Sequence, residues 1–276
     1  MKHLFLGLLL SVFCLAANAQ LKTPAPSTSQ TIKQGFGLSS IELSYSRPNM
    51  KGRKIFGGLV PYGKVWRTGA NAATTLTFED DVIIGGKTIP AGKYGLLTIP
   101  NKTNWDVIIS KQTNVNNPSL YKQEEDMVRV AVKVNTVNMK AETFTMQFAN
   151  VKDESCDLII RWDNVKIAVP IKTDVDSKVM ASIDEAMKGE KPPYFQAGVY
   201  YLNNNKNLKK AEEWLGKAVE AQPDAFWVQH QYAKVLAKNG KKSEAKKVAL
   251  ASKDLAVKAK NADYVKLNDD LIAGLK

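Results

Sequence analysis

The chain is poor in cysteine and histidine, with two of each among its 276 residues. Cys14 and His3 lie near the N-terminus, so the rest of the chain holds only Cys156 and His230. One cysteine cannot form an intramolecular disulfide, and one cysteine with one histidine is too few for a zinc site. A Ser-His-Asp triad before residue 174 is disfavoured too, because no histidine remains there. We therefore expect no metal, no cofactor and no catalytic residues of these kinds.

Long apolar runs are also scarce. Leu4 to Ala16 is apolar, follows the basic start at Lys2, and precedes the triplet Ala17-Asn18-Ala19. This pattern is typical of a secretory signal peptide, cleaved after Ala19. The run is about a dozen residues, short of the roughly 20 that span a bilayer. We expect residues 1–19 to be removed, leaving a periplasmic or extracellular protein without a transmembrane segment.

Acidic residues are outnumbered, with 27 Asp and Glu against 39 Lys and Arg. In the cytoplasm such an excess would suggest nucleic acid as a partner. Behind a secretory signal we expect no nucleic acid, and an anionic glycan, another polymer or an acidic envelope protein instead. The alternative is that the excess of cations only keeps the protein soluble.

Residues 20–173 show short, alternating β-rich runs separated by turn residues, with no helices between them. Parallel strands need long crossovers, so this region is predicted to be an antiparallel β-sandwich. Gly85-Gly86 and Asp163-Asn164 are each predicted to be the turn of a hairpin, the second joining two separate strands. Gln112 to Asp126 lacks the alternation and is predicted to be an exposed loop with one helical turn. Strands are expected near Ile41–Ser46, Thr74–Glu79, Val82–Ile84, Tyr94–Ile99, Trp105–Ser110, Val128–Val137, Thr143–Ala149, Asp157–Trp162 and Val165–Pro170.

Residues 174–276 are rich in Ala, Lys, Glu and Leu, and their apolar period is helical. Small residues recur at a spacing of 34, as in Ala211 and Ala245, which is the tetratricopeptide period. Two units resemble tetratricopeptide repeats, with Pro223 and Gly240 ending helices. Asp254 to Leu275 is expected to be one capping helix. The predicted architecture is therefore an antiparallel β-sandwich followed by a small helical tetratricopeptide-like domain.

The segment Tyr45 to Thr75 combines cations, aromatics and turn residues at high density. Arginine forks bind carboxylate, sulfate or phosphate, and flat aromatic rings stack on sugars. The segment is therefore a candidate binding site for an anion or glycan. The alternative is structural: Phe56, Val60 and Trp66 would plug one end of the sandwich, and Arg67 would satisfy buried carbonyls. The candidate ligand-binding residues are Arg47, Lys51, Arg53, Tyr62, Trp66, Arg67 and Asn71.

The same segment, together with IPAGKYGLLTIP at Ile89 to Pro100, resembles the bacterial domain of unknown function 2911. The resemblance covers roughly Thr31 to Thr173. It implies no reaction, because none is assigned to that family.

Two acidic clusters remain as candidates for catalysis, Glu79-Asp80-Asp81 and Glu124-Glu125-Asp126. The first is interpreted as a solvated turn, since turns favour Asp, and the second as a solvated helix face. Cys156 lies in an apolar strand and is expected to be an unreactive structural thiol. A histidine-independent hydrolase of glycans or phosphoesters, using carboxylates with Arg67, is the alternative function. The preferred function is a non-catalytic envelope binding or scaffold protein.

In the second repeat, Trp227, His230, Lys234 and Lys238 recur every three or four residues and share one helix face. Such a face would suit an acidic peptide or a C-terminal carboxylate of another envelope protein. The alternative is a solvated lysine face with Trp227 packed against its neighbours.

Overall fold

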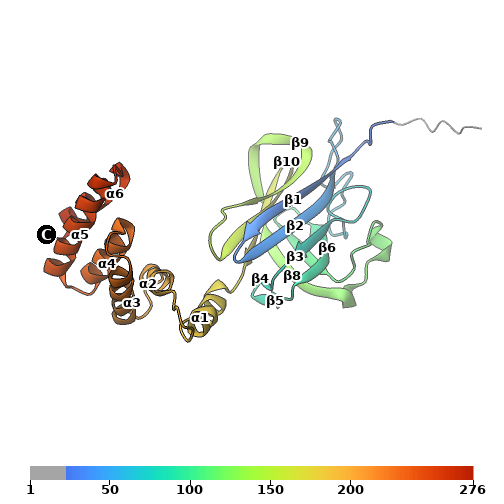
Figure 1. The fold of residues 1–276 in the computed structure, drawn as a ribbon. Coiled ribbons are helices and arrows are strands. Elements are labelled where there is room, and N and C mark those ends of the chain that lie inside the picture. The colour runs from blue at the N-terminus through green and yellow to red at the C-terminus, as the bar shows by residue number, and fades with distance from the viewer. Residues whose placement is uncertain (1–22, 276) are drawn as a thin grey trace, which may run out of the picture. The chain divides into compact units, whose positions relative to one another are not determined.

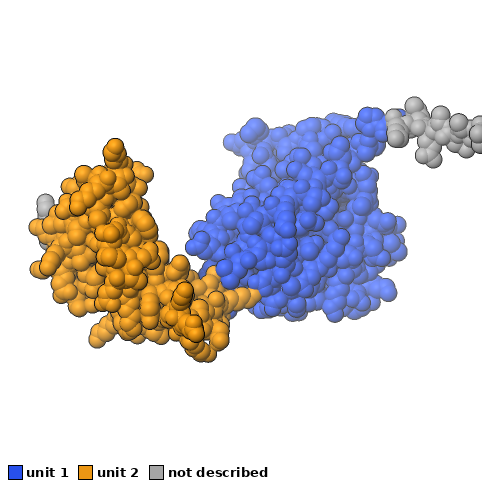
Figure 2. Space-filling view, viewed as in Figure 1, with its two compact units in different colours: residues 1–174 blue, residues 175–276 orange. Residues whose placement is uncertain are grey.

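The computed structural model describes residues 23–275, which form two compact units, with the boundary along the chain between Asp174 and Val175 (Figures 1 and 2). The predicted signal peptide, residues 1–19, lies outside the described residues. No helix in the described part is both long and apolar enough to cross a membrane.

The first unit is an antiparallel β-sandwich, as predicted. Its six-stranded sheet has the order β1-β2-β3-β6-β7-β8, and its four-stranded sheet has the order β5-β4-β10-β9 (Figure 1). The strands are β1 (Thr28–Phe36), β2 (Ser39–Arg47), β3 (Thr75–Phe78), β4 (Val82–Ile84), β5 (Lys87–Ile89), β6 (Gly92–Pro100), β7 (Asn104–Ser110), β8 (Asp126–Lys133), β9 (Asn135–Ala149) and β10 (Ser155–Lys172).

Alternating side chains of the two sheets meet in one core. In β2, Ile41 and Leu43 are fully buried, and Ile160 and Trp162 of β10 belong to the same cluster. A second, smaller cluster of Leu97, Ile108 and Val115 involves β6, β7 and the following loop. The period-two pattern predicts this arrangement, because every second side chain of a strand faces the same side.

The two predicted hairpin turns have different outcomes. Gly85 and Gly86 have φ of 59° and 79°, and β4 pairs with β5 around them, so this hairpin is confirmed. The predicted hairpin at Asp163-Asn164 is wrong. β10 is a single 18-residue strand that runs through these two residues and pairs with β9 both before and after them. Asp163 has φ of 50° and lies at a shift in register. Its left-handed backbone forms a bulge instead of a turn.

Residues 112–126 contain two short 3-10 turns, η1 (Pro118–Leu120) and η2 (Gln123–Glu125), where one helical turn was predicted. The Asn117 side chain accepts a hydrogen bond from the Ser119 N–H and caps η1.

Within residues 175–275 the second unit has six helices: α1 (Val175–Ala186), α2 (Tyr194–Asn203), α3 (Leu208–Ala221), α4 (Phe226–Lys238), α5 (Lys242–Lys258) and α6 (Ala262–Gly274). Gly240 has φ of 78° just after α4, which explains the end of that helix. The single capping helix expected at Asp254 to Leu275 is wrong, because Lys260 has φ of 55° and the Asn261 side chain caps a new helix at the Tyr264 N–H. The tetratricopeptide assignment stays a prediction.

Candidate functional site

The segment between β2 and β3, residues 48–74, joins the two sheets at one end of the sandwich. Asn49 pairs with Thr143 of β9, in the four-stranded sheet, and Trp66 pairs with Thr98 of β6, in the six-stranded sheet. The segment therefore has a structural role, and its side chains must be sorted into those that serve the fold and those that face a ligand.

Trp66 belongs to the aromatic cluster of this end. Its ring stacks on Trp162 with centroids 5.9 Å apart and planes 17° from parallel, while Phe56 and Phe144 contact it edge-on. The Trp66 Nε1–H donates to the Gly69 carbonyl oxygen at 3.2 Å. One face of Trp66 is therefore occupied by protein, and it packs as part of the sandwich end.

A cleft of about 480 Å³ lies along the segment. Its charged lining consists of Lys51, Arg53, Lys64 and Arg67, and no Asp or Glu within residues 23–275 lines it. The volume falls in the range of roughly 300–1,000 Å³ typical of small-molecule sites. We call this feature, with its four cations, the basic cleft. Its other walls are mainly apolar, from Trp66, Trp162, Pro26, Pro48, Leu59, Val60, Pro61, Val65 and Pro118.

Two of the three arginines between Tyr45 and Thr75 are used by the fold. A guanidinium can present its Nε–H and Nη2–H side by side to two oxygens. Arg47 uses this edge for the Phe144 carbonyl oxygen at 3.3 Å and the Thr145 Oγ1 at 3.1 Å. Arg53 uses it for the carbonyl oxygens of Met50 at 2.9 Å and Asn49 at 2.6 Å. Arg47 does not line the basic cleft at all.

Arg67 is bonded differently. Its Nη1 donates to the Asn116 carbonyl oxygen at 3.0 Å, and its buried Nε finds no hydrogen-bond partner in the described part of the chain. A buried donor without a partner costs about 1–3 kcal/mol. Arg67 thus donates to one backbone carbonyl, as the structural interpretation of the segment predicts. Its Nε–Nη2 edge takes part in no hydrogen bond among the described residues.

The turn that follows Arg67 is strained. Thr68 is fully buried with φ of 55°, an unusual backbone angle for a β-branched residue. Its Oγ1 is 3.2 Å from the Trp66 carbonyl oxygen and 3.0 Å from the Thr98 Oγ1, and its own carbonyl accepts from the Thr74 Oγ1 at 2.8 Å. Such strain costs of order 1–3 kcal/mol and persists only where the surroundings impose it. These contacts fix the direction in which Arg67 leaves the backbone.

The structure brings Lys51, Arg53, Trp66 and Arg67 together, but Tyr62 and Asn71 do not line the basic cleft. Tyr62 packs on Gly57, where an added Cβ would lie 2.7 Å from its ring. The Asn71 Nδ2 donates to the Ser27 carbonyl oxygen at 3.0 Å and fixes the start of the described chain.

Sequence reasoning did not select Lys64 or Trp162, which also line the cleft. Lys64 belongs to the cation-rich Tyr45–Thr75 segment, so the composition of that segment could have identified it as a lining residue. Trp162 lies on β10, far along the chain, and no local pattern pointed to it.

A family model described as a protein of unknown function, DUF2911, matches residues 27–171, which is more than half of the chain. The chain belongs to the DUF2911 family. The resemblance inferred from the Tyr45–Thr75 segment is thus confirmed, and the helices lie outside the match. No curated protein and no solved structure matches the chain. The function of this DUF2911 domain has to be argued from its own site.

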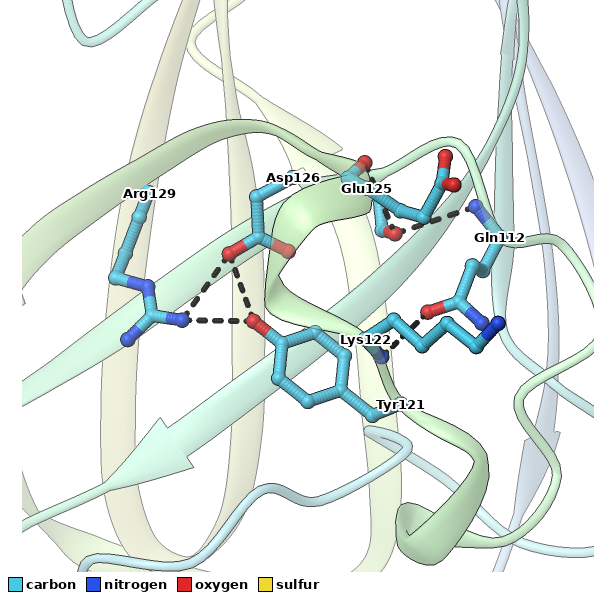
Figure 3. Close-up of polar contacts among 7 residues, drawn as sticks. Gln112, Tyr121, Lys122, Glu125, Asp126 and Arg129 are labelled. Carbon is cyan, nitrogen blue, oxygen red and sulfur yellow. Dashed lines mark hydrogen bonds and ion pairs between the residues drawn. The ribbon is translucent and has the colours of Figure 1, made fainter.

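A polar network holds the loop of the DUF2911 domain after β7 (Figure 3). This loop carries Pro118, which lines the cleft, and Asn116, whose carbonyl accepts from Arg67. The Tyr121 hydroxyl donates to Asp126 Oδ2 at 2.7 Å, and Arg129 Nη2 donates to both at 2.7 and 3.0 Å. Burial, reinforced by Asp126, raises the pKa of Tyr121 to about 12, so the phenol stays a neutral donor. The solvated helix face expected for this acidic cluster is wrong for Asp126, whose carboxylate anchors the loop.

The side chains considered for catalysis serve other purposes. Burial raises the pKa of the Cys156 thiol to about 11, and the side chain is 1% exposed, so Cys156 is packed in the core and its lack of reactivity stays a prediction. Glu79 pairs with Lys33 at 2.7 Å on the surface. Within residues 23–275, no group of three or more His, Cys, Asp and Glu could hold a metal ion.

In the helical unit, the four residues predicted for a peptide groove do not form one open surface. Trp227 is 40% exposed, but His230 is only 5% exposed, with its Nδ1 2.8 Å from Asn268 Oδ1 of α6. Lys238 Nζ donates to Asn205 Oδ1 at 2.7 Å. Burial, and then the neighbouring Lys238, lower the pKa of the half-buried Lys234. The placement of His230 on a ligand-facing surface is therefore wrong, because α6 covers it.

The tautomer of His230 follows from its neighbours. Asn268 Nδ2 donates to the Ser252 Oγ at 2.9 Å and to the Tyr264 carbonyl oxygen at 2.8 Å. Asn268 Oδ1 is then the atom that faces the ring and can only accept, so the neutral imidazole carries its proton on Nδ1.

We expect acid to destabilise the helical unit through His230. Burial lowers the pKa of this imidazole; the hydrogen bond to Asn268 offsets part of the lowering, and Lys234 adds to it. The unfolded chain therefore takes up the proton more readily, and the free energy of unfolding falls as the pH drops from about 6.5 towards the lowered pKa. An NMR titration measures the pKa of the folded imidazole directly, because a chain starting at Gln20 has no other histidine. A midpoint at or above about 6.5 would contradict the prediction.

Proposed function

We propose that this protein is an exported, non-catalytic binding protein whose DUF2911 domain holds an anionic ligand in the basic cleft. The observation that carries the proposal is the cleft's charge: four cations line it, and no carboxylate of the described residues does. A cleft lined by one sign of charge concentrates counter-ions of the other sign. The depression is also sized for a ligand, which a general solubility charge would not require.

The competing function, a histidine-independent hydrolase, needs a carboxylate directed into the same cleft. Glu142 comes near, but its Oε1 accepts the backbone N–H of Lys51 at 2.8 Å, and the residue is absent from the lining. This arrangement favours binding over hydrolysis.

Export and a partner for the helical unit belong to the same proposal. The residue pattern before Gln20 supports secretion to the periplasm or beyond. The helical unit, with its tetratricopeptide-like period, would engage another envelope protein or peptide, and the exposed Trp227 is a suitable contact residue.

We expect Arg67→Ala to weaken anion binding by about tenfold or more, because a hydrogen bond to a charged group contributes about 1.5–3 kcal/mol. The measurement is a thermal-shift titration of the chain from Gln20 with sulfate, phosphate and dextran sulfate, against uncharged dextran at matched ionic strength.

Lys87→Ala is the matched control, since Lys87 is an exposed cation of the same unit outside the cleft. It should bind like the wild type. If no anion raises the melting temperature, or if both variants lose affinity equally, the proposed site is wrong.

A further inference from the structure

The walls of the basic cleft define its ligand more closely than charge alone. We infer that the ligand is a small amphiphilic oxyanion, with a carboxylate, sulfate or phosphate head on a flat apolar body, and not a glycan polymer. This inference rests on the proposed function, since it concerns the same site.

The head group is assigned to Arg67. Arg53 also lines the cleft, but its Nε and Nη2 are already bonded to the carbonyl oxygens of Met50 and Asn49. Arg67 donates only through Nη1 among the described residues, so its Nε–Nη2 edge can take two oxygens of one anion. The Nε atom is covered, and the side chain must turn to present this edge. A single hydrogen bond to the Asn116 carbonyl is a small barrier to that turn.

The two lysines of the cleft add charge without fixed geometry. Lys51 and Lys64 are both exposed, and neither forms an ion pair within residues 23–275. A lysine ammonium acts on an anion as a mobile point charge, whereas the planar guanidinium selects a two-oxygen head. The lysines therefore raise affinity for any anion, and Arg67 provides the selection.

The body of the ligand is assigned to the apolar walls. Leu59 lines the cleft although it is 47% exposed, and Pro48, Pro61 and Pro118 supply flat apolar surfaces beside it. Covering exposed apolar surface is worth roughly 25 cal/mol per Å². A ligand with an apolar body gains this energy, and an inorganic anion does not.

Sugar hydroxyls that donate need acceptors, and beside the Ser27 hydroxyl the described lining offers few. No Asp or Glu of the described residues is present, and the one amide, that of Asn49, already accepts from the Thr143 Oγ1 at 2.7 Å. The Asn49 carbonyl oxygen accepts from Arg53 as well. The cations can donate to sugar oxygens, but a glycan would leave most of its hydroxyl protons without an acceptor here, and burying an unpaired polar group is unfavourable.

The test is a calorimetric titration of the chain from Gln20 with benzoate, 2-naphthoate, the neutral 2-naphthamide, inorganic sulfate and a sulfated oligosaccharide. We expect 2-naphthoate to bind about fivefold tighter than benzoate, from its additional apolar area. The neutral amide should bind at least tenfold more weakly than 2-naphthoate, because it lacks the charge.

Two substitutions separate the head from the body. Leu59→Ser should abolish the advantage of 2-naphthoate over benzoate while sulfate binds as before. Arg67→Lys keeps the charge but loses the two-donor edge and the Nη1 bond to Asn116, so the affinity for both carboxylates should fall while the melting temperature of the free protein drops only slightly. Lys87→Ala should alter none of these values.

The outcomes distinguish this inference from the function on which it rests. Equal affinities for sulfate, benzoate and 2-naphthoate, or tightest binding of the sulfated oligosaccharide, would overturn the amphiphile and leave the anion site intact. Binding of 2-naphthamide as tightly as 2-naphthoate would overturn the oxyanion head. Binding of none of the anions would overturn both proposals.

Discussion

Replacing Trp162 by alanine should lower the free energy of unfolding of the β-sandwich by about 3–5 kcal/mol, the usual range for removing a buried large aromatic side chain. Trp162 is 1% exposed and stacks on Trp66, with Phe56 and Phe144 at its edges. Its Nε1–H donates to the Glu142 carbonyl oxygen at 3.1 Å, which would keep only the Met50 N–H as a donor. The substitution removes both the packing and the hydrogen bond at the end of the sandwich that carries the cleft.

Pulse labelling of Cys156 along a urea series measures the stability of this unit alone. Cys156 is buried in the sandwich, and a chain starting at Gln20 has no other cysteine, so the thiol reacts only when the β unit opens. Leu38→Ala is the control, because Leu38 is 62% exposed and its truncation should change stability by less than about 0.5 kcal/mol. A loss below about 1 kcal/mol in Trp162→Ala would contradict the stacked arrangement.

Gly95→Ala should destabilise the same unit by about 1–3 kcal/mol and also impair anion binding. Gly95 lies in β6 between Thr75 and Ser110 of the neighbouring strands. A Cβ at this position would lie 2.1 Å from the Gln112 carbonyl oxygen, closer than any real contact. Either β6 or the loop at Gln112 must shift, and forcing extra atoms into a packed region typically costs about 1–3 kcal/mol. The loop that moves carries Asn116, which holds Arg67.

The matched control is Gly35→Ala in β1, where an added Cβ meets nothing within 4 Å. Alanine there should be neutral or add up to about 1 kcal/mol, since glycine is unfavourable inside a strand. Cysteine labelling and sulfate titration of both variants give the comparison. Unchanged stability and unchanged binding in Gly95→Ala would show that the loop does not depend on close contact with β6.

Local patterns predicted the strands well where one face is buried. β2 alternates buried and partly exposed side chains, and the sequence period reveals it. β1 was missed, because only Phe36 of its nine residues is buried and the strand is recognised only through its pairing with β2. The bulge at Asp163 was taken for a turn, because a left-handed Asp suits both, and only the pairing of β10 with β9 distinguishes them.

Composition pointed to the segment of the candidate site but did not show which of its residues face the cleft. Cations and aromatics of the Tyr45–Thr75 segment pointed to the end of the sandwich where the basic cleft lies, yet Arg47 and Arg53 have identical chemistry to Arg67 in the sequence. Their hydrogen-bond partners, Phe144 and Thr145 for Arg47 and the adjacent turn for Arg53, decide that these two serve the fold.

The sequence by itself determined the fold class, the family and the segment that lines the basic cleft, because periodicity and composition are properties of neighbouring residues. Only the tertiary structure decided that Trp162 lies behind Trp66, that α6 covers His230, and that Arg67 keeps an edge outside the protein's own hydrogen bonds. These outcomes depend on carbonyl groups and rings that lie far apart along the chain and meet only when the sheets and helices pack.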